Sequence, residues 1–308
     1  MKRVKTVYDH IRSNNIKTAI LVALFPIIFV VLVFLFTWIV VPVDKAIDTA
    51  IGVAVPTFVI CLIWMLISWA FGDSMILHMA NAHQIDDSDS ENKYIYRLVE
   101  NVALAAGLPT PRVYIIEESG MNAFATGRTP NDATVALTRG IINRLDKLEL
   151  EGVIAHEMSH IGNRDIRLEM FVITGLGVTV FISDMILHSI THTSHSRDEK
   201  DNSAAVLFMV WLAFLVFNLI ISPLLHMAIS RKREFAADAT GAQITRNPKA
   251  LASALRKISE NPHVASLSDR KSMAAICIAN PLAKKALISE LMATHPPVEE
   301  RIKRLESM

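Results

Sequence analysis

Long segments without charge divide the chain. Residues 18–43, 49–72 and 202–230 contain no Asp, Glu, Lys or Arg. Each is longer than the roughly 20 residues with which a helix crosses the hydrocarbon core of a bilayer. A fourth apolar segment, residues 170–183, is shorter and ends at Asp184. The pattern predicts membrane-spanning helices, because buried core helices of a soluble domain are rarely so long.

The polar segments between these blocks predict helices and short strands. Ser88–Glu91 has the pattern of a capping box and is expected to open a helix. Short runs bounded by Gly, Pro, Asn and Asp predict strands at residues 113–116, 123–126 and 134–138. After residue 140 the pattern is helical. We therefore expect a mainly α protein with a small β-sheet, of the α+β class, whose soluble domain is interrupted by membrane segments.

Four segments follow from this pattern, alternating between membrane and soluble parts. We expect a first membrane hairpin in residues 1–72 (spans about 18–43 and 49–72), the first part of the soluble domain in 73–169, a second hairpin in 170–230 (spans about 170–190 and 203–228), and the second part of the soluble domain in 231–308.

Composition and charge agree with a membrane protein and suggest its orientation. The chain is 52% hydrophobic with a mean hydropathy of +0.36, and its net charge of +1 gives no basic surface for nucleic acid. Basic residues precede the first uncharged block, while the loop after it holds only Lys45. The positive-inside rule then places the N-terminus in the cytoplasm. Cys61 and Cys277 show no disulfide or metal-binding spacing.

The stretch "HEMSH" carries the clearest candidate chemistry. His156 and His160 are one helical turn apart, so both side chains project from one face of a helix, and Glu157 lies beside the first. This spacing is typical of zinc hydrolases. The metzincin pattern would require a glycine and a third histidine where this chain has Asn163 and Ile166, so that class is excluded.

A third ligand is expected beyond the second hairpin, in "REFAAD". Glu234 and Asp238 are four apart and share a helical face. A carboxylate would complete a site of two histidines and one glutamate, with the fourth position open for water. Asp238, one turn on, suits an acceptor for the free N–H of a ligand histidine. Taken alone, the two acids fit a solvated charged face next to three basic residues better than a metal site.

Together "HEMSH", "EFAAD", "NAFATG" and "THPPVEERI" resemble the HtpX family of membrane zinc endopeptidases, which are relatives of the CAAX prenyl protease. The resemblance implies a cytoplasmic zincin-type metalloprotease domain in a multi-pass protein of the bacterial inner membrane. It further implies one Zn²⁺ per chain, held by His156, His160 and Glu234, with Glu157 as general base and Asp238 as helper carboxylate. The strand Asn122, Ala123, Phe124 and Ala125 would bind the substrate backbone, and His295 and Arg301 would face the active site.

The expected activity is hydrolysis of misfolded or damaged membrane proteins at the cytoplasmic face, as part of a stress response. The expected partners are membrane-protein or unfolded polypeptide substrates and the lipid bilayer, with no nucleic acid. Zinc would activate water and Glu157 would transfer its proton to the leaving amine. His295 or Arg301 would stabilise the oxyanion, or would only fix the last helix in place.

Other functions remain open at this stage. A zinc-binding membrane scaffold would need the histidines but not Glu157, and a CAAX-type processing protease would share the whole site. A transporter would place ionisable residues deep in its spans, where Asp184 is the one candidate. His188, His192 and His195 fit plain loop histidines better than a second metal site. An intramembrane protease is disfavoured, because polar residues surround the motif: Glu149, Glu151, Arg164 and Asp165.

Overall fold

The computed structural model describes residues 7–40, 43–193, 203–218, 231–264, 266, 277–278 and 296–308. His295 and residues 219–228 of the expected span 203–228 lie outside these residues. The chain divides into two compact units. The sheet unit comprises Met1–Ile16, Phe71–Ile173 and His226–Met308, and the helical unit comprises Lys17–Ala70 and Thr174–Leu225.

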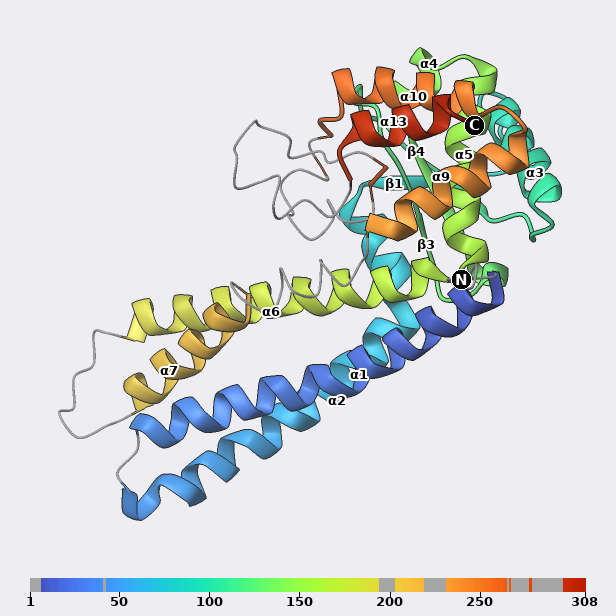
Figure 1. Ribbon diagram of the computed structural model, residues 1–308. Coiled ribbons are helices and arrows are strands. Elements are labelled where there is room, and N and C mark those ends of the chain that lie inside the picture. Colours follow the sequence, from blue (N-terminus) through green and yellow to red (C-terminus); the bar gives the residue numbers. More distant parts are fainter. Residues whose placement is uncertain are drawn as a thin grey trace. The chain divides into compact units, whose positions relative to one another are not determined.

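The helical unit is made from long apolar helices (Figure 1). It contains most of α1 (Val7–Val40) and α2 (Val43–Met79), the later part of α6 (Asp165–Thr193), and α7 (Ser203–Val216). Two stretches are long and apolar enough to cross a membrane by length and composition, Ile11–Leu35 and Ile47–Met79. They overlap the first two expected spans. The expected spans in α6 and α7 stay predictions.

Packing inside the helical unit is mostly aromatic. The ring of Phe29 meets those of Phe214 and Phe217 edge-on, at centroid distances of 4.3 and 5.4 Å. Trp64 Nε1 donates to the Thr174 carbonyl at 3.3 Å, which satisfies an indole N–H among apolar side chains. Large apolar side chains along α1 and α2 are exposed, for example Leu66 at 70%. An apolar outer surface of this kind suits lipid rather than water.

The sheet unit contains a four-stranded mixed sheet in the order β1-β2-β4-β3 (Figure 1). Its strands are β1 (Ala82–Ile85), β2 (Arg112–Ile116), β3 (Ala123–Thr126) and β4 (Thr134–Thr138). β2 and β4 are parallel, while the two outer pairs are antiparallel. The three predicted strands are confirmed. β1 was missed, because four residues with His83 and Gln84 exposed give no apolar pattern.

Helices pack around this sheet and complete the α+β fold. They are α3 (Lys93–Ala106), α4 (Arg139–Arg144), α5 (Lys147–Gly162), α9 (Arg231–Thr245), α10 (Pro248–Glu260) and α13 (Val298–Glu306). The predicted capping box at Ser88–Glu91 is wrong, since α3 begins only at Lys93. Asp89 instead accepts from the backbone N–H groups of Glu91 and Asn92, and so holds a turn.

Candidate metal centre

Helix α5 carries the two histidines on a well-defined, buried segment. It begins with a capping box in which Asp146 accepts from the Glu149 N–H and Glu149 accepts from the Asp146 N–H. His156 and His160 are 1% and 6% exposed. Their Nε2 atoms lie 3.2 Å apart, and their rings are nearly perpendicular. One face of α5 therefore presents two imidazole nitrogens at one point inside the protein.

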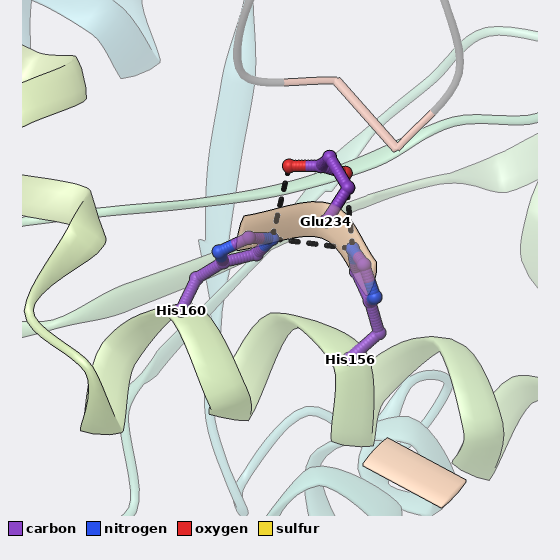
Figure 2. A group of neighbouring side chains, drawn as sticks. All are labelled: His156, His160 and Glu234. Carbon is purple, nitrogen blue, oxygen red and sulfur yellow. Dashed lines mark hydrogen bonds and ion pairs between the residues drawn. The ribbon is translucent and has the colours of Figure 1, made fainter. Parts of the chain in front are cut away.

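Helix α9 brings the third group to the same point. Glu234 Oε1 lies 3.7 Å from His160 Nε2, and Glu234 Oε2 lies 3.8 Å from His156 Nε2. The three candidate ligand atoms are all within 4.8 Å of one another, and all three residues are buried. Figure 2 shows the triangle, with both histidines rising from α5 toward the carboxylate of Glu234. The sequence prediction named these three residues, and the structure brings them together.

The geometry fits a divalent cation. Two metal–nitrogen bonds of about 2.0–2.1 Å at a tetrahedral angle place their nitrogens roughly 3.3–3.4 Å apart. The observed separation of 3.2 Å between the two Nε2 atoms is close to that value. Each Nδ1 atom lies against a carboxylate, at 3.0 Å for His156 and 2.9 Å for His160. With a proton on each Nδ1, the two Nε2 atoms are left with their lone pairs, and a cation bound by both would stabilise that arrangement.

Asp238 and Arg301 form a buried pair behind His156. Arg301 donates from Nε and Nη2 to the two oxygens of Asp238, at 2.8 and 2.7 Å, and it is fully buried. Burial raises the pKa of Asp238, but the charge of Arg301 outweighs it and lowers this pKa to about 2. Asp238 is therefore a carboxylate, and its Oδ1 lies 3.0 Å from His156 Nδ1. Its helper role stays a prediction. Arg301 contacts Asp238 and also donates to the Ile278 carbonyl at 2.9 Å.

Glu157 lies next to the candidate ligands but is not one of the three. It is 2% exposed, and this burial raises its pKa to about 8. Glu157 is thus a buried carboxyl group near the candidate ligands, and its pKa lies close to neutral pH. A group of this kind can both take and return a proton, which is the requirement for general acid–base chemistry.

The predicted substrate strand lies at the outer edge of the described sheet. Asn122 pairs with β4, because its carbonyl accepts from the Thr138 N–H at 3.0 Å. Pairing groups alternate along an antiparallel strand, so Ala123 and Ala125 direct their backbone groups to the outer side. The Ala123 carbonyl accepts from the Ile278 N–H at 3.0 Å. Part of this edge is therefore contacted by another segment of the chain, and Asn122–Ala125 are buried.

Three contributors to this centre were missed from the sequence. Asp165 follows α5 and contacts His160 Nδ1, but it was interpreted as a polar boundary before the apolar segment. Arg233 was counted only as a cytoplasmic charge, yet it pairs with Asp165 at 3.1 Å. Asn14 was not considered, and its amide donates to Asp165 at 2.6 Å. Asp165 gave a local signal, since an acid one turn beyond a ligand histidine suits a carboxylate that fixes it.

Gly241 permits the close approach of α9 to α5, and Gly241→Ala is expected to disturb the centre. A Cβ there would lie 3.0 Å from His156 N and 3.1 Å from His156 Cα. Gly241, Asp238 and Glu234 share one helix face, so α9 must shift away and move the ligand with it. We expect a loss of about 1–3 kcal/mol in stability and weaker metal binding, measured by thermal unfolding and zinc titration.

Gly162→Ala is the matched control for that change. Gly162 is the last residue of α5, the helix that Gly241 faces. A Cβ at Gly162 would lie 3.5 Å from the Leu108 side chain, which is an ordinary contact distance. This variant should therefore keep its unfolding temperature and its metal affinity. Equal behaviour of Gly241→Ala and Gly162→Ala would show that the approach of α9 does not control the ligand geometry.

Comparison with known proteins places the chain in a family. Residues 89–308 match the profile described as peptidase family M48. The Protease HtpX homolog of Lactobacillus helveticus is 44% identical over 255 residues, which are 80% of this chain and 83% of that protein. The Protease HtpX homolog of Bacteroides fragilis is 37% identical over 311 residues, covering 95% of this chain and 96% of that protein.

Among solved structures, the crystal structure of S. mikatae Ste24p resembles this chain with a TM-score of 0.43 and 18% identity, over 86% of this chain and 67% of that one. The family match and the similarity to HtpX homologues cover the segment with the paired histidines and the glutamate, and long apolar helices precede that segment. The chain therefore belongs to peptidase family M48, with HtpX proteases as its relatives, and is a membrane metalloprotease.

Proposed function

We propose that this protein is a zinc-dependent endopeptidase that cleaves misfolded or damaged membrane proteins at the cytoplasmic face of the bacterial inner membrane. The observation that carries the proposal is the buried triangle of His156, His160 and Glu234 with Glu157 beside it. The relatives of this chain are named proteases, which supports peptide-bond hydrolysis rather than metal storage or transport. A scaffold that only bound zinc would have no use for Glu157.

The donor set supports zinc as the cation. Two imidazoles and one carboxylate form the usual protein share of a catalytic zinc site, in which one position remains for water or substrate. Hard cations such as Mg²⁺ and Ca²⁺ prefer oxygen ligands, so two nitrogen donors disfavour them. We infer one zinc per chain. Bound zinc supplies Lewis-acid activation of water and of the scissile carbonyl.

Glu157 is the proposed general base. It receives the proton of the attacking water and delivers it to the amine that leaves when the peptide bond breaks. Burial is the main cause that raises the pKa of Glu157 to about 8, and a nearby cation would lower this pKa, because positive charge favours the carboxylate. At neutral pH the residue is then ionised before the reaction and holds the proton during it.

The roles of Arg301 and His295 separate in this proposal. Arg301 is engaged with Asp238 and the Ile278 carbonyl, so we assign it the positioning of Asp238 and, through it, of His156. The alternative is a direct oxyanion contact, since Arg301 also lies toward the candidate ligand atoms, with Nη2 3.5 Å from His156 Nε2 and Nη1 3.8 Å from Glu234 Oε2. His295 stays a predicted oxyanion partner, outside the described residues. The outer edge of Asn122–Ala125 is the proposed site for the substrate backbone, with Ala125 as the pairing residue, because the Ala123 carbonyl already accepts from the Ile278 N–H.

The connection between the helices supports a position of the site near the membrane surface. α5 ends at Gly162, and α6 begins at Asp165 and runs without a break through the apolar segment to Thr193. Glu234 follows the expected span 203–228 by only a few residues. We propose that both hairpins cross the bilayer, that the N-terminus and the site lie in the cytoplasm, and that the second hairpin returns Glu234 to the side of His160. Bonds close to the cytoplasmic face should then be cleaved preferentially.

Cleavage is therefore expected to depend on distance from the membrane. One unstructured sequence would be tethered to a membrane anchor through spacers of increasing length, and the cut sites would be mapped by mass spectrometry. We expect cuts to stay near a fixed distance from the bilayer and to move along the sequence as the spacer grows. The Glu157→Gln variant serves as the blank for other proteases. Cut sites that follow sequence alone, whatever the spacer, would contradict the proposed location.

A further inference from the structure

A buried polar cluster lies on the far side of His160 from the candidate ligand atoms. His160 Nδ1 lies 2.9 Å from Asp165 Oδ2, and Asp165 is 1% exposed. His156 has the equivalent contact at 3.0 Å with Asp238. Each candidate ligand histidine is therefore backed by one buried carboxylate, although the two carboxylates come from different helices, α6 and α9.

The local backbone explains why Asp165 reaches His160. α5 ends at Gly162, and Arg164 has a φ of 58°, a left-handed conformation that is uncommon for a side chain of this size. This residue separates the two helices and allows the chain to change direction before α6 begins at Asp165. The first residue of α6 is thereby turned back toward the last turn of α5. A longer or extended connection would carry the carboxylate away from the imidazole.

Arg233 holds Asp165 from the ligand helix α9. Its Nη1 lies 3.1 Å from Asp165 Oδ1 and its Nη2 lies 3.1 Å from Glu169 Oε1. Arg233 and Glu169 are both 6% exposed, so these are buried ion pairs whose loss is costly. Arg233 directly precedes Glu234 in the sequence. The same turn of α9 therefore supplies the candidate ligand Glu234 and the counter-ion Arg233. Arg233 fixes Asp165, which is the carboxylate in contact with His160.

Asn14 reaches the same cluster from α1. Its Nδ2 donates to Asp165 Oδ1 at 2.6 Å and to the Asn163 carbonyl at 3.0 Å. Asn14 is 4% exposed, and it belongs to the Met1–Ile16 part of the sheet unit, before the first candidate span. Asn163 is the residue that caps the end of α5. The segment before the span thus contacts both the end of the ligand helix and the carboxylate behind His160.

The geometry points to Asp165 as a positioning residue for His160, held in place by Arg233 and by Asn14 of the segment before the first span. An imidazole on a helix can rotate about its side-chain bonds, and a fixed acceptor at Nδ1 selects both the tautomer and the ring orientation that direct Nε2 to the cation. This inference rests on the proposed zinc site. It makes the segment around Asn14 part of the metal centre rather than only a leader to a membrane helix.

Zinc affinity of the full-length protein, measured by competition with a chromophoric chelator, tests this role. Asp165→Asn keeps the size of the side chain and removes its charge, and we expect zinc affinity to fall about 10- to 100-fold. Asn14→Ala removes one hydrogen bond to a charged group, and we expect a fall of up to about tenfold. Cobalt(II) would be used as a second probe, since its visible absorption reports ligand geometry, and both variants should change that spectrum.

Two variants with similar burial serve as controls. Glu149→Gln changes a buried acid on α5 that pairs with Lys257 at 2.6 Å, and Asn92→Ala changes a buried amide whose partners are Asp89 and Arg139. Both should lose stability but keep zinc affinity and the cobalt spectrum. Unchanged metal binding in Asp165→Asn and Asn14→Ala, or equal losses in the controls, would overturn the inference. If the unsubstituted protein bound no zinc, the proposed function itself would fail, and the two failures are thereby distinguished.

Discussion

Replacement of Glu157 by Gln is expected to abolish proteolysis while about one zinc per chain is retained. Gln has nearly the same size and can occupy the same buried position, but it cannot accept a proton from water. Removal of a general base costs about 10²- to 10⁴-fold in rate. Glu157 is not among the three candidate ligand residues, so metal binding should persist. The check is turnover of an unfolded polypeptide together with metal analysis of the same sample.

Glu151→Gln is the matched control for this variant. Glu151 lies on the same helix, and its carboxylate is 3.8 Å from Lys147 rather than in the centre. Its replacement should leave both turnover and zinc content near the values of the unsubstituted protein. Full activity in Glu157→Gln would refute the proposed mechanism, and loss of zinc in Glu157→Gln would show that this residue contributes to the ligand set.

Glu234→Ala is expected to lose both zinc and activity, whereas Asp238→Ala should weaken zinc binding by about 10- to 100-fold. The two acids lie one turn apart on α9, but they meet different atoms. Glu234 faces the Nε2 atoms of both histidines, and Asp238 faces Nδ1 of His156. Measurement of bound zinc at limiting metal separates the loss of a ligand from the loss of its support.

The outcome also tests whether α9 carries a site at all. If Glu234→Ala and Asp238→Ala bound zinc as tightly as the unsubstituted protein, the two acids would be only a charged pair near a basic segment. Asp238→Ala is also expected to destabilise the fold, because the buried Arg301 would lose both of its hydrogen bonds to a carboxylate. Thermal unfolding in excess zinc should show this second effect separately from metal affinity.

The two candidate ligand histidines were predictable because their pattern is local, whereas Glu234 was assigned through the family resemblance. Two histidines one turn apart, and an acid pair one turn apart, each define a helix face without any knowledge of the fold. The strands at 123–126 and 134–138 were predictable for the same reason, since each is a short apolar run bounded by turn residues. The α+β class followed from these elements together.

Asp165, Arg233 and Asn14 were not predictable as one cluster, because no spacing relates them. They come from α6, α9 and α1, and the hydrogen bond from Asn14 to Asp165 joins residues 151 positions apart. Arg233 also had a sufficient explanation of another kind, as a positive charge beside a membrane span. The left-handed turn at Arg164, which directs Asp165 back to His160, leaves no mark in the sequence, because the residue is neither Gly nor Asn.

The separation of the ligands along the chain has a consequence for biosynthesis. A ribosome synthesises His156 and His160 first, then the apolar segments within residues 170–230, and only afterwards Glu234 and Arg301. At a synthesis rate of about 5–20 residues per second, several seconds pass between the synthesis of His160 and that of Arg301. Nascent chains therefore carry an incomplete set of candidate ligands while residues 170–230 are being made. The candidate metal centre can form only after Glu234 has been synthesised.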